Sequence, residues 1–232
     1  MKHYKHIFFD LDRTLWDFDS NSAQTLLEIL DTFGLNTVVK DKQKWISDYQ
    51  RHNLYVWKLY EKREITKTEL RIERFRLLFD DFGISNQSLM NDVSDYYSLI
   101  APTKAMLMPN AVEVLAYLRP HYKLYILSNG FYKVQLQKME ASGIIDFFEN
   151  VFTSDRLGVA KPDRRIFEES IKSSNARKDQ SIFVGENFET DIRGAKLFGI
   201  DQVWYNHDQV KTEDVPTFEI DNLLELKTIL KV

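Results

Sequence analysis

The chain has 232 residues, enough for one large domain or for a core domain that carries a smaller insertion. Hydrophobic residues make up 44% of it, the formal net charge is -4, and the 31 basic residues are scattered, which disfavours binding to a nucleic-acid polymer. There is no cysteine, so disulfides, thiolate metal sites and cysteine nucleophiles are excluded. Because no apolar stretch approaches the length of a membrane span or of a signal-peptide core, we expect a cytoplasmic protein without a membrane partner.

Five short apolar runs predict β-strands that alternate with helices. The predicted strands are Ile7–Phe9, Lys123–Leu127, Asn150–Phe152, Ser181–Val184 and Gln202–Tyr205. Residues with helical spacing lie at Asn110–Leu118, Val134–Ala141, Arg165–Ser173 and Asp191–Phe198. Strand alternating with helix predicts an α/β fold with a doubly wound parallel sheet, in which the active site lies at the carboxyl ends of the strands.

The region from 19 to 105 interrupts this alternation, because it consists of successive helical patterns without a convincing strand. Within it, Thr66 and Glu69 have the spacing of a capping box before a helix over Leu70–Phe82. We therefore predict two domains. Residues 1–18 and 106–232 form a catalytic core, and residues 19–105 form an inserted helical domain.

Two acids, Asp10 and Asp12, follow the first predicted strand and are separated by one residue. Two carboxylates this close keep their charges only when a cation or a proton intervenes. Mg²⁺ binds carboxylate oxygens while keeping several of its waters. An Asp-x-Asp pair alone is also compatible with a solvated acidic turn, so its interpretation depends on the other strand ends.

The next strand ends carry groups suited to phosphate. Ser128 and Asn129 follow the second strand, where a hydroxyl, an amide and the backbone of a glycine-bearing turn can donate hydrogen bonds to phosphate oxygens. Lys161 stands directly before Pro162, which we expect to open a helix, and its charge would offset the repulsion between an acid cluster and a phosphoester. Taken singly, these residues are also compatible with an ordinary turn and a solvated lysine.

The fourth predicted strand ends in a glycine that is followed by further acids. Glu186 at the strand tip and Asp191 at the start of the next helix could complete an oxygen-only metal site with Asp10, although Asp191 would also suit a helix cap. Because these four groups fall at the carboxyl ends of successive parallel strands, their joint interpretation is a magnesium-dependent phosphoryl-transfer site.

These residues resemble the conserved motifs of the haloacid dehalogenase-like superfamily of phosphohydrolases, and the resemblance extends over nearly the whole chain. The segments that resemble the superfamily's four ordered motifs are Asp10-Leu-Asp-Arg-Thr14, Ser128-Asn129, Lys161-Pro162 and Gly185-Glu-x-x-x-x-Asp191. Within the superfamily, the first motif extended to Phe18 and the stretch from Ser128 to Phe131 are most similar to bacterial house-cleaning pyrimidine 5′-nucleotidases. The resemblance implies a Rossmann-like core, with residues 19–105 as a helical cap that excludes water and selects the leaving group.

The resemblance also implies a role for each site residue. Asp10 would attack phosphorus to form an aspartyl-phosphate, and Asp12 would protonate the leaving alcohol and later activate the hydrolytic water. Mg²⁺ would be held by Asp10, by the backbone carbonyl of Asp12, and by the acids of the last motif. Those acids are Glu186 and Asp191. The residues that would position the phosphoryl group are Thr14, Ser128, Asn129 and Lys161.

Two positions depart from the family pattern. Arg13 stands where members commonly carry glycine, and its side chain could order the surroundings of the turn. Glu186 replaces the more usual aspartate, and its extra methylene leaves open whether Glu186 or Asp191 binds the metal directly.

The predicted function is Mg²⁺-dependent hydrolysis of a small-molecule phosphomonoester, with a nucleoside 5′-monophosphate as the expected substrate of a monomeric or homodimeric 5′-nucleotidase. A sugar-phosphate phosphatase or a phosphomutase would keep the same core motifs. The dehalogenase branch is disfavoured, because it does not need a second acid at Asp12. A non-catalytic phosphate-binding module is disfavoured as well, since Asp10, Asp12 and Lys161 are all present.

Overall fold

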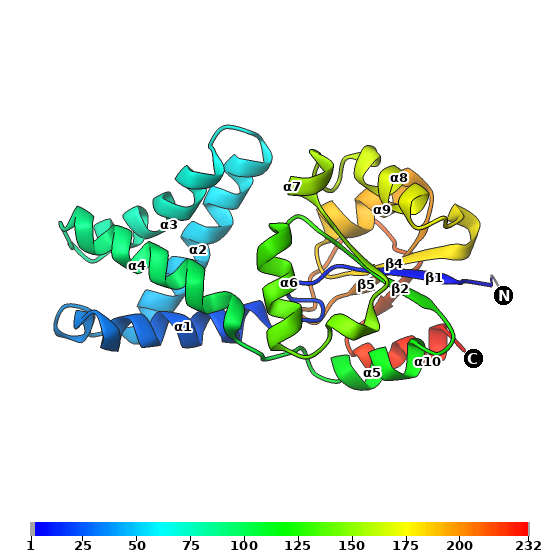
Figure 1. Ribbon diagram of the computed structural model, residues 1–232, viewed down its shortest axis with the longest axis horizontal. Helices are drawn as coiled ribbons and strands as arrows, with labels where there is room; N and C mark the ends of the chain where they lie inside the picture. Colours follow the sequence, from blue (N-terminus) through cyan, green and yellow to red (C-terminus); the bar gives the residue numbers. More distant parts are fainter. Residues whose placement is uncertain (1–2, 232) are drawn as a thin grey trace. The chain divides into compact units, whose positions relative to one another are not determined.

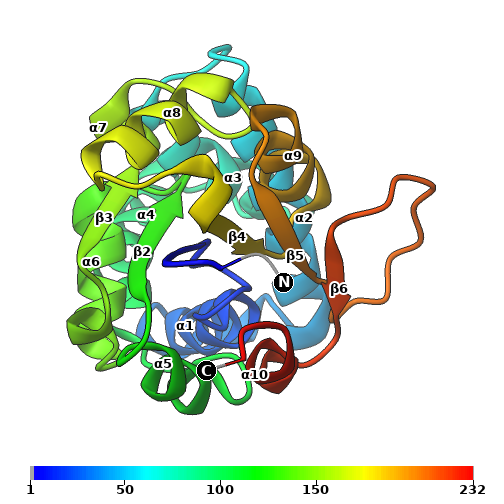
Figure 2. The ribbon, with the colours of Figure 1, turned by 90° about the vertical axis from the view of Figure 1, so that its right-hand side faces the viewer.

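The computed structural model describes residues 3–231, and within them a six-stranded parallel sheet carries helices on both faces (Figures 1 and 2). The strands are β1 (His6–Phe9), β2 (Lys123–Ser128), β3 (Asn150–Thr153), β4 (Ser181–Gly185), β5 (Asp201–Tyr205) and β6 (Phe218–Ile220). Their spatial order is β3-β2-β1-β4-β5-β6, so the chain order reverses at β1. The predicted doubly wound α/β sheet is confirmed, and β1 lies at the switch point where such sheets bind ligands.

Helices flank the sheet, and four of them overlap helical segments predicted from the sequence, whereas the four-residue helices at Ser154–Leu157 and Leu226–Ile229 are not predicted. The flanking helices are α5 (Ala111–Leu118), α6 (Tyr132–Ala141), α7 (Ser154–Leu157), α8 (Arg164–Ser173), α9 (Gly194–Phe198) and α10 (Leu226–Ile229). Figures 1 and 2 show α5 and α10 on one face of the sheet and α8 and α9 on the other. In α5 the buried residues recur at helical spacing, which is why this segment packs as a helix on the sheet.

Two local predictions about helix starts are wrong. Pro162 does not open a helix, because α8 begins at Arg164 and its N-cap is Asp163, whose carboxylate accepts a hydrogen bond from the backbone of Arg165. The helix predicted over Asp191–Phe198 is divided into a π-helical segment, Phe188–Arg193, and the short α9. The side chain of Asn187 caps the π-helical segment, so Asp191 is not needed as a cap.

The core around the central strand is aromatic. All four residues of β1 are buried, as expected for a central parallel strand that is covered on both faces. The ring of Phe8 stacks on Tyr125 with 4.8 Å between centroids, and Phe167 of α8 meets Phe183 of β4 edge-on at 5.7 Å. This packing fixes the strands, and therefore the positions of the polar residues that follow them.

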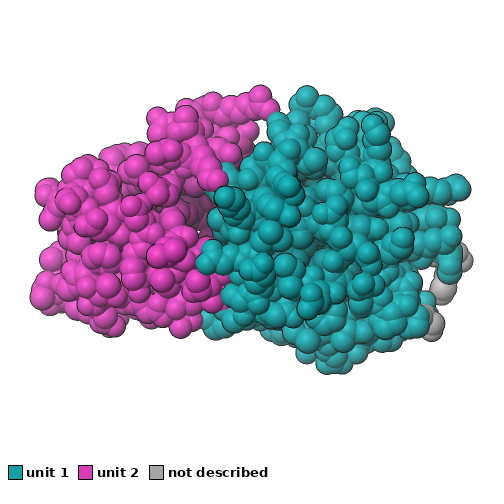
Figure 3. Space-filling view, viewed as in Figure 1, with its two compact units in different colours: residues 1–17, 105–232 teal, residues 18–104 magenta. Residues whose placement is uncertain are grey.

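The described chain separates into two units, drawn in different colours in Figure 3. The sheet unit contains the residues up to Asp17 and those from Ala105 onward, and the second unit is Phe18–Lys104. Each end of the second unit lies one residue before the end predicted for the insertion. Among residues 3–231, no helix combines the length and the apolar character that crossing a lipid bilayer requires.

The second unit is entirely helical in its regular structure. Its α-helices are α1 (Phe18–Thr32), α2 (Lys42–Glu61), α3 (Lys67–Asp81) and α4 (Gln87–Ile100). The predicted capping box is confirmed: the hydroxyl of Thr66 accepts from the backbone of Glu69, and the carboxylate of Glu69 accepts from the backbone of Thr66. Fully buried side chains such as Trp45 and Phe75 give this unit a hydrophobic core of its own.

Two neighbouring segments of the sheet unit lead into and out of the second unit. Trp16 forms an antiparallel bridge with Leu107, and the backbone of Met108 donates to the carbonyl of Leu15 at 2.8 Å. The backbone of Asp17 donates to the carbonyl of Met106 at 3.1 Å. The two ends of the insertion are therefore joined by backbone hydrogen bonds that belong to the sheet unit.

Candidate active site

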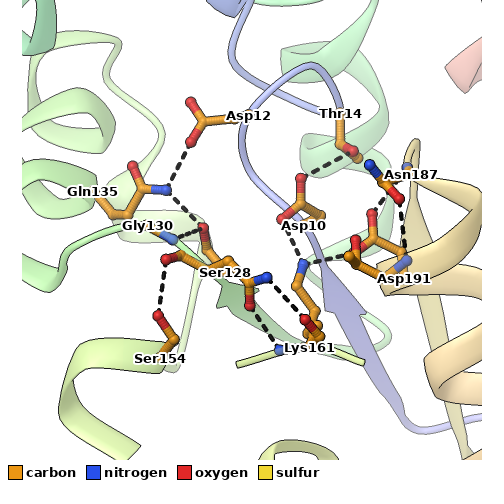
Figure 4. A network of polar contacts seen from close by, with 12 residues as sticks. Asp10, Asp12, Thr14, Ser128, Gly130, Gln135, Ser154, Lys161, Asn187 and Asp191 are labelled. Carbon is orange, nitrogen blue, oxygen red and sulfur yellow. Dashed lines mark hydrogen bonds and ion pairs between the residues drawn. The ribbon is translucent and has the colours of Figure 1, made fainter. Parts of the chain in front are cut away.

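The structure gathers polar residues from four separate segments at the carboxyl ends of the central strands (Figure 4). Asp10 directly follows β1, and Ser128 is the last residue of β2. Lys161 lies between α7 and α8, and Asp191 belongs to the π-helical segment after β4. Residues that are far apart in the sequence thus line one edge of the sheet.

Lys161 lies between two carboxylates. Its Nζ is 2.7 Å from Oδ1 of Asp10 and 2.7 Å from Oδ1 of Asp191. The exposed fractions of these side chains are 2% for the lysine, 11% for Asp10 and 1% for Asp191. One ammonium therefore offsets two largely desolvated carboxylates, which leaves an excess of negative charge.

This charge balance appears in the protonation of Asp10. Burial raises the pKa of Asp10 to about 7, an effect that Lys161 opposes and Asp191 increases. Burial works against the charge on Lys161, but the two carboxylates outweigh it and hold the pKa of Lys161 above its usual range. The arrangement keeps the lysine cationic and leaves Asp10 close to its protonation midpoint near neutral pH.

Asn129 positions Lys161. Its Oδ1 accepts a hydrogen bond from the backbone N–H of Lys161 at 2.7 Å, and its Nδ2 donates to the carbonyl of Lys161 at 3.0 Å. The amide of Asn129 thus pairs with both the backbone N–H and the backbone carbonyl of Lys161. The sequence predicts Asn129 as a phosphate-binding residue, and the structure adds this contact with the lysine backbone.

Arg13 occupies a backbone conformation that explains the glycine usual in the family. Its φ is 61°, in the left-handed region that glycine adopts without a steric penalty. Its guanidinium pairs with Asp208, and its Nε is 3.8 Å from Oε2 of Glu186. The neighbouring Thr14 is fully buried, with its hydroxyl 3.5 Å from Oδ2 of Asp10.

Glu186 and Asp191 differ in their surroundings. The carboxylate of Glu186 is near Arg13, whereas Asp191 contacts Lys161 and accepts from the backbone of Asn187 at 3.1 Å. Burial raises the pKa of Glu186 to about 8, with Asp191 adding to the shift and Arg13 opposing it. A Cβ on Gly185 would lie 2.4 Å from Oδ2 of Asp191, so glycine at the strand end permits the close approach of this carboxylate.

Asp12 points away from Asp10, towards α6 (Figure 4). Its Oδ1 is 2.5 Å from Nζ of Lys138, and its Oδ2 accepts from the side-chain amide of Gln135 at 2.8 Å. Sequence reasoning identifies neither partner. A signal is present, because Gln135 and Lys138 are three residues apart on the helix face that also carries the buried Met139.

The donor set fits Mg²⁺ in its chemistry. The predicted metal ligands offer only oxygen, and the raised pKa values of Asp10 and Glu186 indicate that these carboxylates lack sufficient nearby positive charge, as expected where a cation belongs. Over residues 3–231, however, no three acidic or histidine side chains are already grouped as ligands. Lys161 contacts both Asp10 and Asp191, and the Asp12 carboxylate is turned to α6, so of Asp12 only the backbone carbonyl could take part.

Comparisons with known proteins agree with this fold. A family model described as haloacid dehalogenase-like hydrolase matches residues 4–199. The chain is similar to the pyrimidine 5′-nucleotidase PynA of Streptococcus pneumoniae, with 30% identity over 96% of this chain and 93% of that protein. It is 29% identical to the pyrimidine 5′-nucleotidase YjjG of Escherichia coli, over 97% and 96% of the two chains.

The chain is also similar to a sugar-phosphate phosphatase and to a solved hydrolase structure. A glyceraldehyde 3-phosphate phosphatase of Methanothermobacter thermautotrophicus is 29% identical over 97% of this chain and 99% of its own length. Among solved structures, the magnesium-bound putative HAD-hydrolase YfnB of Bacillus subtilis has a TM-score of 0.88 and 25% identity, with both chains covered completely.

Proposed function

The chain belongs to the haloacid dehalogenase-like hydrolases, and from this premise we propose that it hydrolyses phosphomonoesters through an aspartyl-phosphate on Asp10, with Mg²⁺ as cofactor. The observation that carries the proposal is the position of Lys161, buried between Asp10 and Asp191. An ammonium beside a carboxylate nucleophile offsets the repulsion that a phosphate dianion would otherwise meet there.

In the proposed first step, Oδ of Asp10 attacks phosphorus and the bond from phosphorus to the ester oxygen breaks. Asp12 donates a proton to that oxygen as it leaves. In the second step, Asp12 removes a proton from water, the water oxygen attacks phosphorus, and the bond to Asp10 breaks to release phosphate. Asp12 therefore serves as an acid and then as a base.

The other site residues act on the transferring group. Thr14, Ser128 and Lys161 would donate hydrogen bonds to its oxygens, and Asn129 would keep Lys161 in place. Mg²⁺, when bound, would neutralise part of the charge on these oxygens. The residues proposed to hold it are Asp10, Asp12 through its carbonyl, Glu186 and Asp191.

We propose a nucleoside 5′-monophosphate as the substrate. Two full-length relatives carry the name pyrimidine 5′-nucleotidase, which supports the narrower similarity of the first and second motifs. The insertion, Phe18–Lys104, is proposed to select the leaving group. The similarity to a glyceraldehyde 3-phosphate phosphatase makes a small sugar phosphate the second candidate.

A phosphate-release screen tests the proposal. The substrates are pyrimidine and purine nucleoside monophosphates, sugar phosphates and p-nitrophenyl phosphate, each with Mg²⁺ and with a chelator. We expect the highest kcat/KM with pyrimidine monophosphates and no release in the chelator. Preference for a sugar phosphate would overturn the nucleotidase proposal, and phosphate retention with isomerisation of the substrate would indicate a mutase. No release from any substrate would overturn the hydrolase proposal itself.

A further inference from the structure

One side-chain amide on α6, that of Gln135, is shared by two residues of the proposed active site (Figure 4). Its nitrogen donates to Oδ2 of Asp12 at 2.8 Å and to Oγ of Ser128 at 2.6 Å. A primary amide has two N–H hydrogens, so both are used. Gln135 itself is fully buried, with 0% of its surface exposed.

Charge fixes the orientation of this amide. If the amide were turned over, its oxygen would face the carboxylate of Asp12, and two acceptors would repel each other. In the observed orientation, Oε1 of Gln135 is buried and has no hydrogen-bond partner among residues 3–231. A buried acceptor without a donor lowers stability, so packing alone does not explain a glutamine at this position.

The same amide determines what the hydroxyl of Ser128 can do. Oγ of Ser128 accepts from Gln135 and also from the backbone N–H of Gly130 at 3.0 Å. Both of its lone pairs are then occupied, which leaves its own hydrogen to donate. A glycine at position 130 leaves room for the amide of Gln135 beside Ser128, because a Cβ on residue 130 would lie 2.2 Å from Nε2 of Gln135.

Lys138, one turn further along α6, holds the other oxygen of Asp12. Its Nζ is 2.5 Å from Oδ1 of Asp12, and only 8% of the lysine side chain is exposed. The same ammonium lies 4.4 Å from the ring centroid of Trp16, which follows Asp12 in the same turn. The carboxylate and the aromatic ring together keep this lysine in place.

We propose that Gln135 and Lys138 are positioning residues of the reaction. They hold the Asp12 carboxylate by both oxygens for proton transfer at the leaving group, and Gln135 also presents Ser128 as a hydrogen-bond donor to phosphate. The inference rests on the proposed function, because it assumes that Asp12 is the acid and base.

The test uses two substrates that differ in their need for an acid. When a pyrimidine nucleoside monophosphate is cleaved, the leaving group is the 5′-oxygen of the nucleoside, which must be protonated as it leaves. When p-nitrophenyl phosphate is cleaved, p-nitrophenolate leaves without a proton. Because kcat/KM covers binding and the departure of the leaving group, it reports the step in which Asp12 acts as an acid. For Lys138→Met we expect kcat/KM to fall on the order of 10²-fold with the nucleotide and no more than about threefold with the aryl phosphate. Gln135→Met should show a similar extra loss with the nucleotide, in addition to a loss that both substrates share because Ser128 is no longer aligned towards phosphate.

Matched variants control for general effects on α6. Among residues 3–231, neither Lys133 nor Gln137 of the same helix forms a hydrogen bond or ion pair with Asp12, so Lys133→Met and Gln137→Met should leave both rates unchanged. Lys138→Arg keeps a cationic donor and should recover most of the nucleotide activity. Thermal melting shows whether each variant folds, and Lys138→Met tests the inference even if Gln135→Met does not fold.

Competitive inhibition by inorganic phosphate separates the effect of Gln135 on Ser128 from the effect of Gln135 and Lys138 on Asp12. Gln135→Met should weaken inhibition, because Ser128 loses its alignment, whereas Lys138→Met should not. In folded variants, an equal loss with both substrates, or no loss, would overturn the positioning roles, and unchanged inhibition in Gln135→Met would overturn the link to Ser128. A wild-type protein that hydrolyses neither substrate would instead overturn the proposed function.

Discussion

Asp10 and Asp12 are two residues apart, yet they have different surroundings. Asp10 is largely buried beside Lys161, and 29% of the Asp12 side chain is exposed beside Lys138. A buried carboxylate that faces one lysine suits a nucleophile whose position must not change. A carboxylate at the border of the site suits proton exchange with a leaving group and with water.

The first prediction concerns Asp10→Asn. The amide has the shape of the carboxylate but cannot form the aspartyl-phosphate, so kcat should fall by at least about 10³-fold. The substitution also removes one negative charge from a site in which Lys161 offsets both Asp10 and Asp191. We therefore expect an unchanged or raised melting temperature in metal-free buffer. Turnover within tenfold of wild type would contradict the assignment of the nucleophile.

The second prediction is that the metal-free protein loses stability as the pH rises. The pKa values of Asp10 and Glu186 are raised in the folded protein, to about 7 and about 8. The folded state then binds protons more tightly than the unfolded state, so this stabilisation is full below the ordinary carboxyl pKa and is lost as the pH rises through these values. His6, whose pKa is lowered from 6.5, acts in the opposite direction only below that value.

Melting temperatures in a chelator, measured from pH 6.5 to above pH 8, should therefore decline. The decline should be smaller in Glu186→Gln, which removes one of the two titrating carboxyls. Mg²⁺ should reduce it in the wild type, because a bound cation favours the charged carboxylates. A melting temperature that rises over this interval would contradict the assigned protonation states.

At the scale of elements, the end of β4 sets the position of Asp191. In Gly185→Ala the new Cβ would lie 2.4 Å from Oδ2 of Asp191, so the carboxylate must move. We expect the Mg²⁺ concentration needed for half-maximal activity to rise by about tenfold. Gly199→Ala is the control, because its φ of 94° strains alanine far from the site: it should lower the melting temperature but not the response to Mg²⁺. Equal Mg²⁺ responses in both variants would contradict this role of Gly185.

The sequence predicts those elements whose pattern is local. Strands β1 to β5 are largely apolar runs that are directly followed by a polar residue, so each is recognisable within one or two residues. The sequence does not predict β6, because Phe218–Ile220 has three residues with one buried side chain, too few to produce a pattern. Part of the π-helical segment Phe188–Arg193 is predicted as α-helix. A single π-helical turn is too short to change the spacing of the apolar residues enough to be recognised in the sequence.

The site, too, can be predicted from the sequence only as far as local patterns and strand ends determine it. The rule that parallel strands end at one edge is enough, with the sequence alone, to bring Asp10, Ser128 and Glu186 into one neighbourhood. Lys161, which follows α7, and Asp191, in the π-helical segment, reach that edge through the course of the loops after β3 and β4. Which partner each of them takes depends on tertiary packing. The contact between Asp12 and Lys138 joins residues 126 positions apart, and no local pattern specifies it.

At the scale of the whole molecule, the insertion can be tested as a unit. Replacing Phe18–Lys104 with a short glycine-serine linker should leave the sheet unit folded, because the bridge between Trp16 and Leu107 already joins the two ends. We expect hydrolysis of p-nitrophenyl phosphate to persist and the preference among nucleotides to disappear, as measured by circular dichroism and kcat/KM. A truncated protein that keeps the nucleotide preference would contradict the role proposed for the insertion.

The same bridge between Trp16 and Leu107 has a consequence for how this fold can diversify. The entropy lost on closing a chain segment grows only with the logarithm of its length, by about 0.6 kcal/mol for each doubling. Once the ends are joined, a longer or shorter segment between them changes the stability of the sheet very little. With the leaving group selected by the insertion, as proposed, substrate preference can vary by exchange of this one segment while the proposed catalytic residues stay as they are.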